Sequence, residues 1–233
     1  MKYFWLIIFC LPMILPAENL HSEFIQLANK KGFIGYENKV SVFQTPEWQT
    51  WISDAKKSPQ IFEFMLYSTA SYSMTAVNIK SWGNVPAGLL AALAVQEITG
   101  KSWLDYDGRN PTVCNQIALA KKAYQPYTFL LQILGNHTAR IELHKFFRRQ
   151  YYGTKPAKVL SQKELTALAE QQLVKIYGSR VLKQRPWKII QDDFTITLSG
   201  TLHQPKQGYR LGGTAFIVLK KDDGQILFYT HGK

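Results

Sequence analysis

The stretch that decides the fold is residues 161–200, SQKELTALAEQQLVKIYGSRVLKQRPWKIIQDDFTITLSG. Ser161 and Glu164 have the spacing of a capping box, in which each side chain binds a free backbone N–H at the start of a helix. Apolar residues then recur at helical spacing until Gly178, so the pattern predicts a helix that ends at this glycine. Two strand-like runs follow, before and after a short polar turn at residues 191–193.

A second pair of strand-like runs lies in residues 214–231, TAFIVLKKDDGQILFYTH. Its turn carries Asp222, Asp223 and Gly224, and an Asp-Gly turn between apolar runs is a strong hairpin signal. One helix followed by two hairpins predicts a compact α+β domain over residues 161–233. The predicted strands are residues 187–190, 194–202, 214–219 and 225–231.

Short motifs occur in a set order through this block. They are Ile176-Tyr177-Gly178, Arg185-Pro186-Trp187, a strand closing on Gly200, the pair Gly212-Gly213, and a final run from Asp223-Gly224 to His231-Gly232-Lys233. In order and spacing they resemble the nuclear-transport-factor-2-like fold immunity proteins, small bacterial proteins that neutralise a toxin made by the same or a neighbouring cell. The resemblance covers about a third of the chain. It implies structural roles for Tyr177, Gly178, Pro186, Gly200, Gly212, Gly213, Gly224, His231 and Lys233.

The resemblance also implies a cognate toxin protein as the partner and no cofactor. Trp, Tyr and Arg dominate binding energy when they are buried at an interface, and a basic protein is steered toward an acidic partner. Residues on or beside the predicted strands that fit this chemistry are therefore candidate toxin-binding residues, although Trp187 and Tyr229 could equally fill the core. The candidates are Arg185, Trp187, Tyr209, Arg210, Tyr229 and His231.

The first residues have the pattern of a secretory signal peptide: Lys2, an apolar run over residues 3–15, and the small residue Ala17. Cleavage after Ala17 would place the mature protein in the periplasm or outside the cell, without a transmembrane segment. Lipid attachment through Cys10 is the weaker interpretation, because Phe9 stands where a small residue would be needed. After cleavage Cys114 would be the remaining cysteine, and its apolar neighbours predict a buried filler.

The chain has 233 residues, of which 46% are hydrophobic and 19% charged, and this composition predicts a folded protein of one or two domains. Its net charge of +12 indicates an anionic surface or an acidic protein as partner. Export argues against nucleic acid. The densest basic and aromatic run, residues 145–152, predicts an amphipathic helix with aromatic side chains in the core and solvated charges, in preference to a binding patch.

Residues 18–153 predict a mainly helical domain, followed by a linker at residues 154–160. Pro59 would open a long helix over residues 60–79. The other predicted helices are residues 86–99, 112–124, 127–134 and 138–151.

No catalytic or metal site emerges from the sequence. Asp105 and Asp107 lie in a loop that lacks the further oxygen ligands of a calcium site, so a turn is the better interpretation. Glu142 and His144 are two residues apart and would point to different sides of a helix. We therefore expect an exported immunity protein that covers the active site of a toxin without catalysis. The alternative is a periplasmic carrier or enzyme that uses the cone-shaped cavity of this kind of fold for a small ligand.

Overall fold

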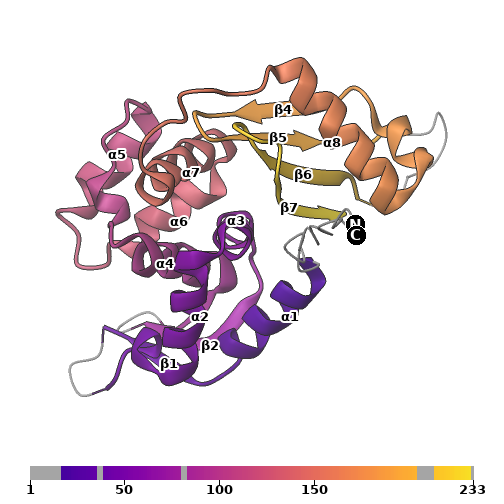
Figure 1. The fold of residues 1–233 in the computed structure, drawn as a ribbon. Coiled ribbons are helices and arrows are strands. Elements are labelled where there is room, and N and C mark those ends of the chain that lie inside the picture. The colour runs from indigo at the N-terminus through magenta and orange to yellow at the C-terminus, as the bar shows by residue number, and fades with distance from the viewer. Residues whose placement is uncertain (1–16, 36–38, 80–82, 204–212, 232–233) are drawn as a thin grey trace, which may run out of the picture.

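The computed structural model describes residues 17–35, 39–79, 83–203 and 213–231 (Figure 1). Except for Ala17, the expected signal peptide and its Cys10 lie outside these residues. Within the described part, no helix combines the length and the apolar character needed to cross a membrane.

The protein has the α+β fold expected, with a mainly helical first part and a four-stranded antiparallel sheet near the C-terminus. The helices are α1 (Ala17–Ala28), α2 (Pro46–Lys57), α3 (Pro59–Ser68), α4 (Ala87–Thr99), α5 (Pro111–Ala120), α6 (Tyr127–Gly135), α7 (His137–Tyr152) and α8 (Gln162–Tyr177). Short 3-10 helices are η1 (Val42–Gln44), η2 (Trp103–Asp105) and η3 (Ser179–Gln184). The strands are β1 (Gly32–Ile34), β2 (Met74–Ile79), β3 (Gly83–Pro86), β4 (Lys188–Gln191), β5 (Thr195–Ser199), β6 (Ala215–Lys220) and β7 (Ile226–His231).

The predicted helix over residues 60–79 is confirmed only as far as Ser68. α3 ends at Ser68, and residues from Met74 onward form β2, which pairs with β1 in parallel and with β3 antiparallel. Thr75, Val77 and Ile79 are buried while the residues between them are more exposed, which is the period of two that a strand requires. A small three-stranded sheet thus lies within the helical part.

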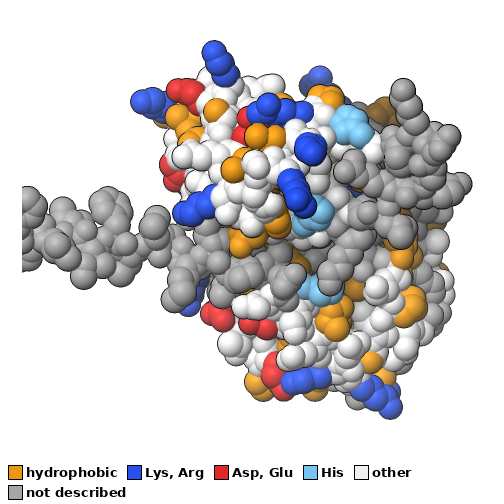
Figure 2. Space-filling view, turned by 90° about the vertical axis from the view of Figure 1, so that its right-hand side faces the viewer, with side chains coloured by type: hydrophobic (Ala, Val, Ile, Leu, Met, Phe, Trp, Pro, Cys, Tyr) orange, Lys and Arg blue, Asp and Glu red, His pale blue; other side chains and the backbone are white. Residues whose placement is uncertain are grey.

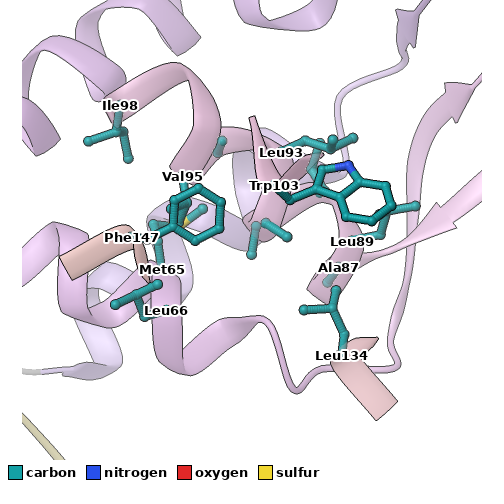
Figure 3. Close-up of a cluster of buried hydrophobic side chains, with 14 of the residues drawn as sticks. Met65, Leu66, Ala87, Leu89, Leu93, Val95, Ile98, Trp103, Leu134 and Phe147 are labelled. Atoms are coloured by element: carbon teal, nitrogen blue, oxygen red, sulfur yellow. The ribbon is translucent and has the colours of Figure 1, made fainter. Parts of the chain in front are cut away.

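α4 is the centre of the helical part, because its residues are apolar on every side and nearly all are buried. It begins after Pro86 and ends at Gly100, whose φ of 65° is the left-handed conformation that stops a helix. Figure 3 shows side chains from α3, α7 and the 3-10 helix η2 around it. The labelled residues are Met65, Leu66, Ala87, Leu89, Leu93, Val95, Ile98, Trp103, Leu134 and Phe147.

The C-terminal sheet has the order β4-β5-β6-β7 and helices on both faces (Figure 1). One face of the sheet packs on α8 and forms a separate hydrophobic core with it. The strands contribute Ile196, Leu198, Ile217 and Leu219 to this core, and α8 contributes Leu165, Ala169 and Leu173. The other face packs on the helical part. Its members Val218, Leu227 and Phe228 belong to the same core as α1 to α7.

Aromatic contacts join the helical part to this second face. The ring centroids of Phe64 and Phe228 are 6.1 Å apart, and those of Tyr67 and Phe216 are 5.1 Å apart. Leu160, in the predicted linker, donates a backbone hydrogen bond to Lys221 at 2.8 Å. The helical part therefore covers a sheet face that would otherwise expose apolar side chains to water, while the division into two folding units at residues 154–160 stays a prediction.

Candidate functional site

The capping box predicted at the start of α8 is present. The Ser161 hydroxyl accepts from the Glu164 backbone N–H, and the Glu164 carboxylate accepts from the Ser161 N–H at 2.8 Å. These bonds fix where α8 begins, and its buried stripe then sets which side faces the sheet. Of the candidate toxin-binding residues, Arg185 and Trp187 lie in the segment after α8, and Tyr229 and His231 lie on β7.

Arg185 and Trp187 meet on Glu170 of α8. The Arg185 guanidinium donates from Nε and Nη2 to the two carboxylate oxygens, at 2.6 and 2.5 Å, and the Trp187 indole Nε1 donates to Oε1 at 2.6 Å. The hydrogen bond from Arg185 holds the pKa of Glu170 below its ordinary value. Arg185 is exposed and Trp187 is half-buried against the α8 core, so both present part of their surface to solvent.

Tyr229 and His231 lie on β7 beside the end of α8. The Tyr177 ring contacts both, with centroid distances of 6.4 Å to Tyr229 and 5.3 Å to His231. His231 also contacts the Gln184 side chain at 3.2 Å, next to Arg185 in the chain. The four candidates that the structure describes therefore lie around the second half of α8. Tyr209 and Arg210 lie outside the described residues.

Of the residues that the resemblance marks as structural, Gly212 and Lys233 lie outside the described residues. Gly178 ends α8 with a φ of 76°, as its position after the helix predicts. Gly200 is needed for space, because a Cβ there would lie 2.2 Å from the Gln184 Oε1 that accepts a hydrogen bond from the Ala215 N–H. Pro186 follows a cis peptide bond.

Three exposed cations stand at the end of α8 and in η3: Lys175, Arg180 and Lys183. None of them has an ion pair or a side-chain hydrogen bond with any residue that the structure describes. Arg180 and Lys183 are three residues apart in a 3-10 helix, which has three residues per turn, so their side chains lie on the same side. In Figure 2, which shows the molecule from the right-hand side of Figure 1, Lys and Arg side chains gather in the upper part of the view, over the part of the molecule that contains α8.

A buried ion network lies on the opposite face of the sheet. The Arg148 side chain of α7 is 8% exposed, and it donates to both Glu63 oxygens and, from Nη1, to Asp192 at 3.0 Å. Burial alone would lower the pKa of Arg148, but the two carboxylates outweigh it and raise the pKa. The Tyr152 hydroxyl donates to Glu63 at 3.0 Å. The expectation that the charges of residues 145–152 are all solvated is therefore wrong for Arg148, while Phe146 and Phe147 are in the core as expected.

Asp192 also fixes the turn between β4 and β5. Its carboxylate accepts from the backbone N–H groups of Phe194 and Thr195, at 2.8 and 2.9 Å. The network thus ties this turn to α3 and α7. The sequence carries one signal of this network, because two charged residues stand inside apolar runs: Glu63 in IFEFML and Arg148 after two phenylalanines. A charge that is buried with such neighbours needs a partner of opposite charge.

The structure places the other chemistry-bearing residues in structural roles. The Asp105 carboxylate caps the 3-10 helix η2 by accepting from the Ser102 N–H at 3.1 Å, so Asp105 has a local structural role, in a capping box in place of the predicted turn. Cys114 is exposed, which corrects its prediction as a buried filler: α5 turns Val113 and Ile117 inward and Cys114 outward. The described residues contain no cluster of three or more side chains that could hold a metal ion.

The structure has the helix and the two hairpins in the order that the resemblance predicts. Residues 166–233 match the family model of the NTF2 fold immunity proteins. The match begins one turn inside α8 and includes the whole four-stranded sheet, under a third of the chain. Neither the curated proteins nor the solved structures compared with the chain include a match. We call residues 166–233 the immunity-protein block.

Proposed function

We propose that this chain is an exported immunity protein that binds a cognate bacterial toxin and neutralises it by covering the active site, without catalysis of its own. The observation that carries the proposal is the match of the immunity-protein block to its family. Export is inferred from the signal-peptide pattern of residues 1–17. A protein exported in this way would meet its toxin in the periplasm or during the toxin's passage through it.

We propose that the toxin binds on the α8 side of the block. The opposite face of the sheet is covered by the helical part, whereas the α8 side presents Arg185, part of Trp187 and the cations Lys175, Arg180 and Lys183 to solvent. Arg and Trp provide the area and hydrogen bonds that interfaces use, and unpaired cations speed the approach of an acidic partner. The partner that fits is a toxin with an acidic surface around its active site.

The function is tested with the product of the neighbouring toxin-like gene, produced in the periplasm of a bacterial host. The full-length chain should restore growth, and a chain lacking residues 1–17 should not, because it would not reach the toxin. Growth arrest that the full-length chain does not relieve, together with no binding between the two purified proteins, would contradict the proposal. Relief by the chain without residues 1–17 would contradict export alone.

The binding face is tested by charge reversal with a matched control. Arg180→Glu with Lys183→Glu should slow association about tenfold or more at low salt, because the steering charge is reversed. The control, Lys121→Glu with Lys122→Glu, makes the same change in charge at the far end of α5, on exposed residues distant from α8 (Figure 1). Equal effects of the two pairs would mean that only net charge matters, and the α8 side would be rejected.

A further inference from the structure

A partly enclosed cavity of about 150 Å³ lies between the sheet of the immunity-protein block and the helices that cover it. Its walls come from α3 and α7 on one side and from β4, β5 and β6 on the other. Most of the lining is apolar, including Leu66, Ile141, Ile190, Phe216 and Val218. An apolar cavity of this volume is about large enough for a benzene ring.

Arg140 of α7 also lines the cavity, and it lacks the counter-ion that an enclosed cation normally has. Its guanidinium donates to the Leu134 carbonyl at 2.5 Å and lies 3.4 Å from the His137 ring Nδ1. Among the described residues, no carboxylate is within ion-pair distance of it. Partial burial lowers the pKa of Arg140, because it disfavours the charged form.

Arg148, which lies two turns further along α7, shows how a paired arginine in the same lining differs from Arg140. Arg148 is enclosed by two carboxylates, which leave it no free charge to offer a ligand. The two guanidinium groups thus differ in their pairing: the buried Arg148 is neutralised by carboxylates of the protein, and the half-buried Arg140 is not. A ligand oxygen with a negative charge would complete the pairing of Arg140.

The charges of the lining set the charge of the ligand. The lining contains Arg140, Arg148 and Glu63. His144 accompanies them, with its ring Nε2 2.9 Å from the Thr69 hydroxyl, and burial together with Arg148, Arg140 and His137 holds its pKa well below the ordinary value. Since Arg148 is paired with Glu63 and Asp192 and His144 is neutral, Arg140 is the lining cation that has no carboxylate partner among the described residues, and one ligand carboxylate would pair with it.

We propose that this cavity binds a small monocarboxylate, whose ring or branched apolar part fills the space between α3, α7 and the sheet and whose carboxylate pairs with Arg140. This site lies on the opposite face of the sheet from the proposed toxin surface and uses none of its residues. It goes beyond toxin binding, and either proposal can fail while the other stands.

The test uses benzoate, cyclohexanecarboxylate and 4-methylpentanoate as probes, with benzamide as the neutral control of the same shape as benzoate. Binding to the chain of residues 18–233 is measured by calorimetry, and backbone NMR shifts locate the site. At least one carboxylate should bind with shifts at Ile141, Thr197 and Phe216, and benzamide should bind about tenfold or more weakly than benzoate, because its neutral carbonyl pairs more weakly with the guanidinium than a carboxylate does.

Two variants test separately the charge of Arg140 and the volume of the cavity. Arg140→Gln should remove the preference for benzoate over benzamide while leaving benzamide binding unchanged, so a loss of both, or a retained preference, would overturn the role of Arg140. Ala70→Phe, at an exposed position of the lining, should block every probe. Arg185→Gln, on the α8 side, is the matched control and should bind benzoate as the wild type does.

Failure of all three carboxylates, or binding with shifts only elsewhere, would overturn the proposal. If the probes fail and Arg140→Gln instead abolishes binding of the candidate toxin, the cavity receives an acidic side chain of the partner and the small-molecule proposal is rejected. Unchanged toxin binding by Arg140→Gln, with lost benzoate preference, would support two separate sites.

Discussion

Replacement of Arg148 by Met should strongly destabilise the protein, because it leaves two carboxylates buried without their cation. Methionine keeps most of the apolar stem, so the change removes mainly the charge and its hydrogen bonds. The side chains of Glu63 and Asp192 are 0% and 7% exposed. Removal of one partner of a buried ion pair costs about 3–5 kcal/mol, a large part of the roughly 5–15 kcal/mol that stabilises a domain.

Urea unfolding of the chain of residues 18–233, followed by tryptophan fluorescence and circular dichroism, measures this cost. With a slope of about 3 kcal/mol per molar for a protein of this size, Arg148→Met should lower the midpoint by about 1–2 M. The matched control is Arg185→Met, which breaks the exposed pair with Glu170 and should shift the midpoint far less. Equal shifts for the two variants would refute the assignment of Arg148 as the buried link.

A triple variant tests whether unpaired buried charge is the cause of the stability lost by Arg148→Met. In Arg148→Met with Glu63→Gln and Asp192→Asn, no buried charge remains. The Gln can still accept from Tyr152 and the Asn from the Phe194 and Thr195 N–H groups. Replacement of a whole buried ion network is often neutral, so the triple variant should recover much of the midpoint lost by Arg148→Met. A further loss would mean that packing of the guanidinium, and not its charge, holds this region together.

Three further predictions concern stability. Burial lowers the pKa of His144 in the folded protein, so the unfolded chain takes up the proton first, and stability should fall as the pH drops below about 6.5, by at most about 1.4 kcal/mol per pH unit. In urea melts at pH 7.5 and 5.5, His144→Gln should reduce this dependence of stability on pH, and an unchanged dependence would argue against the role of His144. A fragment of residues 161–233 should unfold cooperatively, because its core on α8 is complete, and should bind a hydrophobic dye, because it exposes Val218 and Phe228; a melt without cooperativity would contradict the division into two folding units. Ser161→Ala should cost about 1 kcal/mol in the full chain through the lost helix cap, and no change in its urea midpoint would mean that α8 is held by packing alone.

The immunity-protein block could be predicted because its signals are local. The capping box of α8, the glycine that ends it and the Asp-Gly turn each act within a few residues, and the structure has an element boundary at each of them. The predicted strand over residues 194–202 is longer than the observed β5 (Thr195–Ser199), since Gly200 ends the strand beside Gln184. That contact joins residues far apart in the chain, so the run of strand-like residues gave no sign of it.

The failure at residues 60–79 also has a non-local cause. Apolar residues continue beyond Ser68, now mixed with Ser and Thr, but the chain turns there, where the backbone N–H of Gly88 donates to Ser71 at 2.9 Å and that of Ala87 donates to Ser73 at 2.7 Å. A Cβ at position 88 would lie 2.5 Å from the Thr69 carbonyl, so glycine permits this close approach. The alternation from Thr75 to Ile79 was the available strand signal, and it was hidden at the end of a longer apolar run.

The ion network could not be predicted because Glu63 and Arg148 are 85 residues apart and Asp192 is 44 residues further on. Composition places such residues at the surface, and only the packing of α3 against α7 brings them together. A ligand cavity is expected only in the alternative function that the resemblance leaves open, and the residues that line the observed cavity could not be predicted for the same reason. Arg140 looks like one more surface cation of a basic chain until its neighbours are known.

The arrangement of the layers limits how the block could meet a toxin. A four-stranded sheet offers two faces, and here the helical part covers one of them through Phe228 and Val218 while Arg148 holds the β4–β5 turn against it. A toxin could reach that face only by displacing a buried core and breaking a buried ion network, at a cost comparable with the whole stability of the domain. Binding at the α8 side breaks no buried contact, because its cations Lys175, Arg180 and Lys183 already face water. The helical part thus directs the proposed partner to the α8 side by closing the other face.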